Sequence, residues 1–261
     1  MNTGFDFPHA LATTNSEDIV ASTGDVDDIY PLASVTKVIT ALAALVAVER
    51  HLVDLDAPAG PPGSTIRHLL AHASGLPFDG GARLATPGSR RVYSNRGIEV
   101  LGEHLAEASG MSVQEWIEQS VLLPLGMAAT TCTGSPAHGG SGSVRDLAAL
   151  GRELLHPTLI STELHAEATS PQLPGLSGIL PGYGRQADNA WGLGFEIRAS
   201  KTPHWTGADF PPETFGHFGQ SGSFLWVDRS IDRAGAFLGQ RPFGEQHKAS
   251  WPALTDAMRK A

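Results

Sequence analysis

The stretch PLASVTKVITALAALVAVER, residues 31–50, decides the fold and raises the first question about function. From about Ser34 onward its apolar residues cover nearly the whole circumference of a helix, and such a helix is buried. Lys37 interrupts this apolar run three residues after Ser34, on the same face of the helix. Ser34 is therefore either a helix cap followed by an isolated lysine or a nucleophile followed by its base.

The apolar surroundings of Lys37 favour the second interpretation. Burial disfavours the charged form of a lysine, so its pKa falls and a neutral amine becomes available to accept a proton. A serine at the first helical turn has an unpaired backbone N–H and lies at the positive end of the helix dipole. These are the requirements of an activated serine nucleophile, although the Ser-x-x-Lys spacing also occurs by chance.

Strand-like segments stand at both ends of the chain. HALATT (residues 9–14) and DIVAST (residues 18–23) precede the helix, and aromatic and β-branched residues return after residue 188. The later segments are NAWGLGFEIRA, ETFGHFG, GSFLWVDR and GAFLGQRP.

Helical patterns fill the middle of the chain. STIRHLLAHASG reads as a short helix capped by Ser64, and SVQEWIEQ opens with a capping box from Ser112 to Glu115. SNRGIEVLGEHLAEASG and SVRDLAALGRELLH are further helices, and a last helix runs from about His247 to Lys260.

This order predicts an α+β fold, with an antiparallel five-stranded sheet from both chain ends, flanked by helices, and an all-helical inserted subdomain. We expect residues 1–54 and 186–261 to form the sheet subdomain and residues 55–185 to form the helical insert. The two are expected to pack as one compact catalytic unit.

Composition limits the partners. The chain has 27 acidic and 18 basic residues, a net charge of -9 and no basic stripe, so nucleic acid and membrane surfaces are not expected partners. No apolar run is long enough to cross a bilayer, and the first residues lack the basic start and apolar core of a signal peptide. These features predict a cytoplasmic protein, and they leave its oligomeric state open.

Two features that often carry chemistry have simpler explanations here. Cys132 is the single cysteine, has no motif around it and is expected to be a small buried hydrophobic residue. His68 and His72 have the i, i+4 spacing of some metal sites, but no third ligand is indicated. We therefore expect no metal and no cofactor.

Two further short motifs suggest a site. YSN, residues 93–95, stands just before a helix, where the Tyr93 hydroxyl can transfer protons and the Asn95 amide can bind a carbonyl. HFG, residues 217–219, ends a strand, where Gly219 permits close approach of another backbone and His217 offers an imidazole. Alone, each motif is also an ordinary helix start or a glycine-rich hairpin.

Taken in order, SVTK, YSN and HFG resemble the serine β-lactamase and penicillin-binding protein superfamily, most closely its class C-like branch of esterases and D-aminopeptidases. STIRHLLAHASGLP, LLPLGMAATT, GGSGSVRDLA and WGLGFEI also resemble segments of that family. The resemblance covers about residues 20–240 and implies the β-lactamase/transpeptidase-like fold, in agreement with the fold predicted from the pattern.

The resemblance also implies roles for individual residues. Ser34 would be the nucleophile that accepts the acyl group, and Lys37 would deprotonate it or hold the proton network. Tyr93 would be the general acid and base for the leaving group and the deacylating water, which requires Lys37 nearby to favour the phenolate.

Substrate binding would fall to the remaining motif residues. Asn95 would bind the acyl-side amide or hold Lys37, and Gly219 would lie along the substrate. The backbone N–H groups of Ser34 and Gln220 would form the oxyanion hole.

His217 stands where many members of the family carry a lysine. A histidine is mostly neutral at pH 7, so esters or amides without an obligatory carboxylate are favoured as substrates. The chain is also short for the family, which predicts a more open cleft.

The expected function is therefore a serine hydrolase that forms an acyl-enzyme at Ser34, a carboxylesterase or small amidase. A β-lactamase or D,D-peptidase, a D-amino-acid amidase and an acyltransferase share this mechanism and stay open. A non-catalytic binding module on the same fold is the alternative from another class, but it predicts loss of Ser34, Lys37 or Tyr93.

Overall fold

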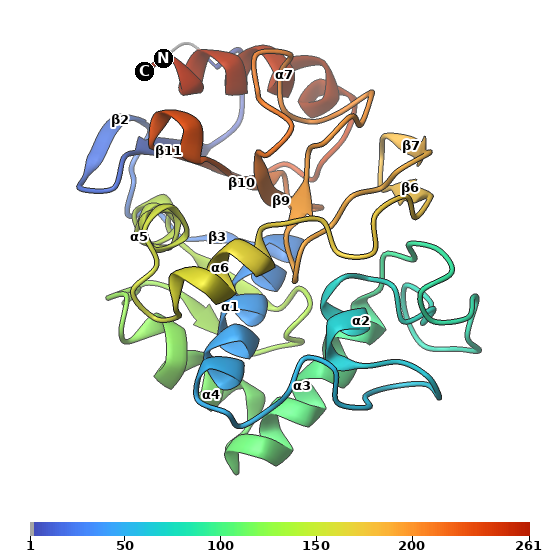
Figure 1. The fold of residues 1–261 in the computed structure, drawn as a ribbon. Helices are drawn as coiled ribbons and strands as arrows, with labels where there is room; N and C mark the ends of the chain where they lie inside the picture. Colours follow the sequence, from blue (N-terminus) through green and yellow to red (C-terminus); the bar gives the residue numbers. More distant parts are fainter. Residues whose placement is uncertain (1–2) are drawn as a thin grey trace.

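The computed structural model describes residues 3–261, and an antiparallel sheet made from both ends of the chain dominates it (Figure 1). Its strand order is β2-β1-β11-β10-β9-β8. The strands are β1 (His9–Thr14), β2 (Ile19–Thr23), β8 (Glu196–Ile197), β9 (Phe215–Gly219), β10 (Ser223–Asp228) and β11 (Arg233–Gly239). The sheet thus has six strands rather than the five predicted, because the two-residue β8 pairs with the edge of β9.

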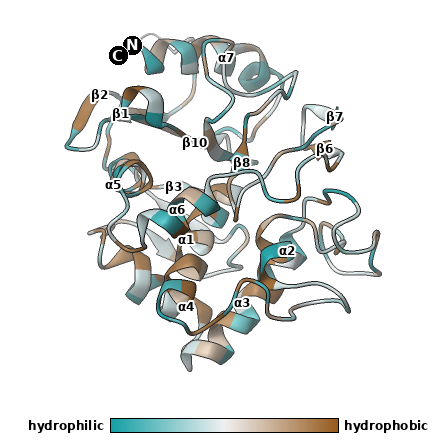
Figure 2. Ribbon diagram, in the orientation of Figure 1, coloured by the Kyte–Doolittle hydropathy of each residue, from teal (hydrophilic) through white to brown (hydrophobic). Residues whose placement is uncertain are grey.

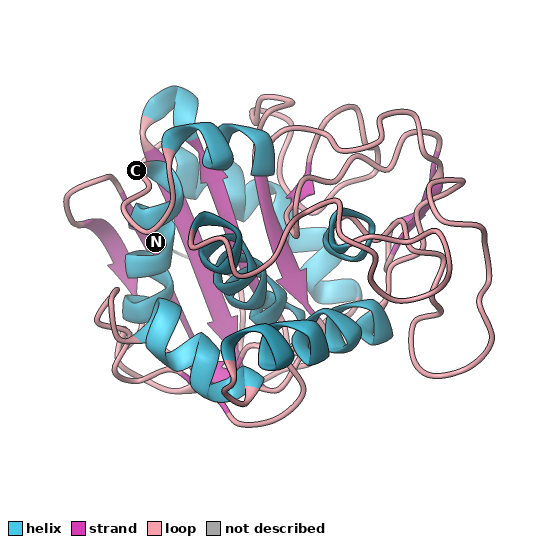
Figure 3. Cartoon of the chain, turned by 60° about the horizontal axis from the view of Figure 1, so that its bottom comes forward, coloured by secondary structure: helices cyan, strands magenta, loops and turns pink. Residues whose placement is uncertain are grey.

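Side chains alternate along the strands between two hydrophobic cores. Phe224 and Trp226 of β10 pack with Trp251 of α7 (Glu245–Arg259) on one face of the sheet. Leu225 and Val227 point to the other face, which α5 (Val144–Leu155) covers. Figure 3 shows helices on both sides of the strands, so the predicted α+β arrangement is confirmed.

The apolar helix predicted from residues 31–50 lies at the centre of the molecule. It is α1 (Thr36–Glu49), and every residue from Thr36 to Ala47 is buried. A 3-10 turn, Ala33–Val35, precedes it and carries Ser34. In Figure 2 α1 is mostly white to brown, whereas α7 also carries teal, hydrophilic turns.

The middle of the chain is mainly helical. It contains α2 (Ile66–Leu70), α3 (Asn95–Ser109), α4 (Val113–Ile117) with a π-helical continuation (Glu118–Leu122), α5 and α6 (Thr162–Ala168). The capping box of Ser112 and Glu115 is confirmed. The predicted cap Ser64 is wrong, because the side chain of the next residue, Thr65, accepts the N–H of His68.

Short strands also occur in the region that was predicted to be all-helical. β4 (Thr131–Cys132) and β5 (Gly140–Gly142) form a small sheet with β3 (Tyr30–Pro31), which leads into the turn that holds Ser34. β6 (Gly178–Leu180) and β7 (Gly184–Gln186) form a hairpin. These strands are too short to show the alternating sequence pattern that predicts a strand.

None of the helices within residues 3–261 combines the length and the hydrophobicity of a membrane-spanning segment.

A buried ion pair fixes the edge of the sheet beside β9. Glu196 in β8 accepts from Lys201 at 2.9 Å and from His204 at 2.9 Å, and the Trp205 indole N–H donates to its other oxygen at 2.5 Å. Burial alone would raise the pKa of Glu196, but the Lys201 charge and the His204 and Trp205 contacts lower it well below its usual value. Because Glu196 pairs with Gly216, this cluster braces the strand that carries His217.

Replacing Lys201 with methionine should therefore lower the free energy of unfolding by about 3–5 kcal/mol, since it leaves Glu196 buried without its main cation. Urea denaturation measures this loss. The double variant Glu196→Gln/Lys201→Met removes both charges and should recover much of it. Equal losses in the single and double variants would show that the pair does not act as a unit.

Candidate active site

Ser34 lies where the chain changes direction, between β3 and α1. The preceding residue, Ala33, has a left-handed backbone with φ of 44°, a conformation that costs a non-glycine residue of order 1–3 kcal/mol. Backbone contacts hold the turn from the side of β5: the Leu32 N–H donates to the Gly140 carbonyl at 2.9 Å, and the Gly140 N–H donates to Thr36 Oγ1 at 3.0 Å. The fold thus sustains a strained backbone directly before Ser34.

Lys37 is completely buried and its amine contacts three oxygens. Nζ lies 2.6 Å from Asn95 Oδ1, 2.8 Å from the Ala137 carbonyl and 3.2 Å from Ser34 Oγ. Two of these partners, the amide oxygen and the carbonyl, can only accept hydrogen bonds. A neutral amine that donates its two hydrogens to them has its lone pair left for Ser34.

The electrostatics favour that neutral amine. Burial lowers the pKa of Lys37 to about 7, against the opposing influence of Asp79 and Glu99. Near neutral pH a large fraction of the amine is therefore unprotonated and can accept the proton of Ser34 Oγ. The structure brings together the nucleophile and base predicted from the SVTK motif.

The YSN loop places Tyr93 beside the same amine. Nζ of Lys37 lies 4.8 Å from the centre of the Tyr93 ring, and the Tyr93 hydroxyl lies 3.0 Å from His217 Nε2. Asn95 begins α3, whose N-cap is Ser94 with its side chain accepting from the Gly97 N–H. Asn95 contacts Lys37, one of the two roles considered from the sequence.

Tyr93 is protonated, which differs from the expectation that Lys37 favours its phenolate. Burial raises the pKa of Tyr93, and the hydrogen bond with Ser34 only partly offsets this rise. Lys37 gives only limited help, because with a pKa of about 7 its amine is charged in only part of the molecules near neutral pH. In the free protein Tyr93 is therefore placed to donate a proton rather than to accept one.

His217 is neutral as well. Burial, together with the charge that Lys37 carries when protonated, lowers the pKa of His217 to about 3. Its Nδ1 is buried and has no hydrogen-bond partner within the part of the chain that the structure describes. The His217 position of β9 thus carries no permanent positive charge.

The end of β9 is pressed against the backbone at Ser34. A Cβ atom on Gly219 would lie 2.5 Å from the Leu32 carbonyl oxygen and 3.1 Å from the Ser34 nitrogen. Ser221 and Ser223 secure the turn after β9 by donating to the carbonyls of Pro31 at 2.7 Å and Leu32 at 2.8 Å.

This packing brings together the two N–H groups predicted to form the oxyanion hole. Gln220 follows Gly219 directly, so its N–H and that of Ser34 belong to adjoining segments. Within residues 3–261, neither N–H has a backbone acceptor. Both are therefore free to stabilise a developing negative charge.

The supporting roles of three residues were not predicted from the sequence. Asp79 accepts from Asn95 Nδ2 at 3.2 Å and so orients the amide that holds Lys37. The Ala137 carbonyl takes the second amine hydrogen. His72 accepts the Ser94 N–H at 3.2 Å and packs on Tyr93 with ring centres 4.7 Å apart, which fixes the YSN loop. Of the three, only His72 could have been found from the sequence, because it stands in the LLAHASG segment that resembles the family.

Cys132 and His68 lie outside this constellation. Burial raises the pKa of the Cys132 thiol to about 12, in agreement with the buried hydrophobic residue that was predicted. His68 Nδ1 contacts Thr65 Oγ1 at 2.9 Å, whereas His72 faces Ser94. The two histidines of the i, i+4 pair therefore have separate partners.

Known proteins are similar to this chain in sequence and in fold. The sequence profile described as Beta-lactamase matches residues 10–258. The D-alanyl-D-alanine-carboxypeptidase/endopeptidase AmpH of Escherichia coli is 30% identical over 148 residues, which are 42% of this chain and 38% of that protein. The match thus spans well under two thirds of that relative.

Solved structures cover the chain more completely. The crystal structure of a beta-lactamase from Mycobacterium bovis has a TM-score of 0.97 and 49% identity, and the match covers 98% of this chain and 96% of that one. EstCE1, described as a hydrolase with promiscuous acyltransferase activity, has a TM-score of 0.77 over 97% of this chain and 93% of that one. At 17% identity, EstCE1 shows the fold alone.

Replacing Gly219 with alanine should slow modification of Ser34 by a fluorophosphonate about 100-fold, because the new Cβ would push the end of β9 away from the Ser34 N–H. Intact-mass spectrometry of the adduct over time measures the rate. Gly80→Ala is the matched control, since a Cβ there meets no atom within 4 Å. Equal rates in the two variants would argue against an oxyanion hole at this contact.

Proposed function

The chain belongs to the beta-lactamase family of serine hydrolases, and we propose that it is a carboxylesterase or small amidase that forms an acyl-enzyme at Ser34. The family confirms the resemblance inferred from SVTK, YSN and HFG. The observation that carries the proposal is the buried Lys37 amine, with a pKa of about 7, at 3.2 Å from Ser34 Oγ. The chain's own residues suffice for a complete catalytic cycle of acylation and deacylation.

Acylation begins with a proton transfer from Ser34 Oγ to the neutral Lys37 amine. Oγ attacks the carbonyl carbon, and the N–H groups of Ser34 and Gln220 stabilise the oxyanion. Tyr93, protonated at the start, donates its proton to the departing alcohol or amine as the bond to the acyl carbon breaks. The products of this half are the acyl-enzyme, a Lys37 ammonium and a Tyr93 phenolate.

Deacylation reverses the charges. The Tyr93 phenolate, stabilised by the adjacent ammonium, takes a proton from water, whose oxygen attacks the acyl carbon. The Ser34 oxygen leaves and recovers its proton from Lys37. The cycle therefore consumes one water and returns all three side chains to their starting states.

The neutral His217 supports esters or simple amides over substrates with a carboxylate at the strand edge. A carboxylate there would be buried against an uncharged imidazole whose pKa is about 3, without the charge-assisted hydrogen bond that a lysine supplies. An ester or amide without that carboxylate has no such cost. The proposed substrates are small molecules, and nothing in the mechanism calls for a metal or a cofactor.

β-Lactam hydrolysis is the second candidate. It is favoured by the 49% identity, over 98% of the chain, with the Mycobacterium bovis protein described as a beta-lactamase. Turnover of the β-lactam nitrocefin distinguishes this candidate from an esterase. If His217 disfavours the β-lactam carboxylate, nitrocefin turnover should be at least about 10-fold slower than 4-nitrophenyl acetate turnover. Faster nitrocefin turnover would favour the second candidate.

The proposal is tested by rapid mixing with 4-nitrophenyl acetate and intact-mass analysis. We expect a burst of one nitrophenolate per chain and an acetyl adduct that maps to Ser34. Ser34→Ala is the matched control, because it removes only the hydroxyl, and turnover should fall at least about 1,000-fold. Turnover that survives this substitution, or no adduct on the native protein, would overturn the proposal.

A further inference from the structure

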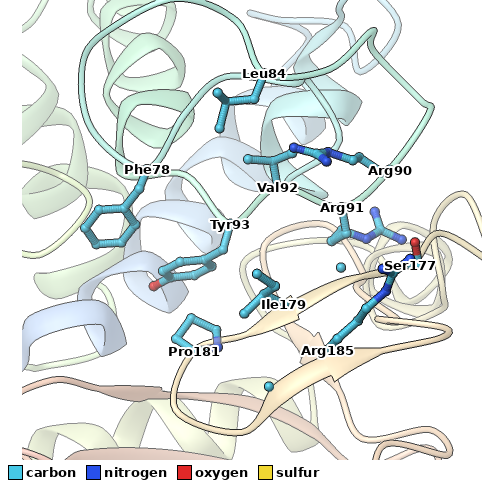
Figure 4. A pocket seen from close by; sticks show the side chains of 12 residues that line it. Phe78, Leu84, Arg90, Arg91, Val92, Tyr93, Ser177, Ile179, Pro181 and Arg185 are labelled. Atoms are coloured by element: carbon cyan, nitrogen blue, oxygen red, sulfur yellow. The ribbon is translucent and has the colours of Figure 1, made fainter.

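A cavity of about 580 Å³ opens beside Tyr93, between the loop before α3 and the β6–β7 hairpin. Figure 4 shows the Tyr93 ring at one end of it, between Phe78 and Pro181. Phe78, Leu84 and Ile179 line this cavity although each is at least half exposed, at 50%, 56% and 65%. Apolar side chains that remain exposed on facing walls are suited to an apolar ligand group.

The charged residues that line the cavity are basic, although the chain as a whole is acidic. Arg90, Arg91 and Arg185 line it, and among the described lining residues none is acidic, although the chain has 27 acidic and 18 basic residues. Arg91 is occupied, because its guanidinium is buried and donates to the carbonyls of Ala71 at 2.6 Å and Asn189 at 3.0 Å.

Arg90 and Arg185 are different. Both are exposed, and the ion pairs found within residues 3–261 involve other arginines. In Figure 4 the Arg185 side chain extends toward Ser177, and Arg90 lies beside Val92 on the opposite wall. Two exposed arginines outside these ion pairs thus line one largely apolar cavity.

The backbone ties this cavity to the catalytic loop. Gly178 of β6 forms a bridge with Arg91, and the Arg91 N–H donates to the Ser177 carbonyl at 2.9 Å. Across the hairpin, Ile179 pairs with Arg185, so an apolar and a cationic side chain stand side by side. The position of Arg185 relative to Tyr93 is therefore set by paired strands rather than by a free loop.

We infer that this cavity selects substrates whose variable part is an apolar alkyl or aryl body ending in an anionic group, such as a carboxylate. The apolar walls bury the body, and Arg90 and Arg185 bind the anion at the end away from the scissile bond. This inference rests on the proposed function for the reaction and adds the substrate class. It also agrees with a neutral His217, because the anion sits in the cavity and not at the strand edge.

Isothermal titration calorimetry with two inert ligands tests the inference. 4-Phenylbutyrate and 4-phenylbutanamide have the same apolar body and differ in charge. We expect the carboxylate to bind the native protein roughly 10-fold tighter than the amide at low salt, with the difference shrinking as ionic strength rises.

The variant Arg90→Gln/Arg185→Gln should remove the preference for the carboxylate while the amide still binds. Arg83→Gln is the matched control, since Arg83 is an exposed arginine that does not line the cavity, and it should keep the preference. Equal affinities for the two ligands, no binding of either, or a preference that survives the double substitution would overturn the inference. Failure of the proposed function would show separately, as the absence of a Ser34 adduct.

Discussion

The desolvation of one amine governs the chemistry that we propose for this protein. Lys37 enters the apolar helix α1 and is buried there from all sides, so its charged form is penalised until its pKa reaches about 7. The two other titratable groups of the proposed site are less suited to deprotonate Ser34: burial keeps Tyr93 protonated, and His217 is hydrogen bonded to Tyr93 rather than to Ser34. In the proposed mechanism the apolar composition of α1 therefore serves catalysis as well as packing.

The sheet and the helical region each supply half of the site. Ser34 comes from the 3-10 turn before α1, and Lys37 comes from the first turn of α1. The YSN loop leads into α3, and the N–H groups proposed for the oxyanion hole lie where β9 meets the Ser34 turn. Glycine at 219 is required because two backbones approach so closely there that a side chain would collide with the Leu32 carbonyl. Bracing of β9 through Glu196 and Lys201 then gives the sheet edge a role in holding His217.

Much of this site follows from local patterns. Ser34, Lys37, Tyr93 and His217 stand in short motifs whose order along the chain is distinctive, and α1 is visible as an unbroken apolar run. The strands β3 to β7 were not predicted, because two or three residues show no periodicity, whereas β8 lies within the segment NAWGLGFEIRA that was predicted as a strand.

The protonation states and the supporting contacts needed the structure. Asp79 reaches Asn95 from an exposed loop that the sequence does not mark, and the contact at Ala137 is a backbone carbonyl, which any residue could offer. The protonated state of Tyr93 reverses the sequence expectation, because its burial outweighs the proximity of a lysine that is only partly charged near neutral pH.

The most direct test is a titration of Lys37 by NMR. The chain has four lysines, so the ε-carbon signals of ¹³C-lysine-labelled protein are few, and Lys37→Arg assigns the signal of interest. Burial predicts a midpoint near the value of about 7 at which the amine becomes a usable base. A midpoint above about 9, close to the ordinary lysine value, would mean that Lys37 stays charged beside Ser34 and would contradict the account.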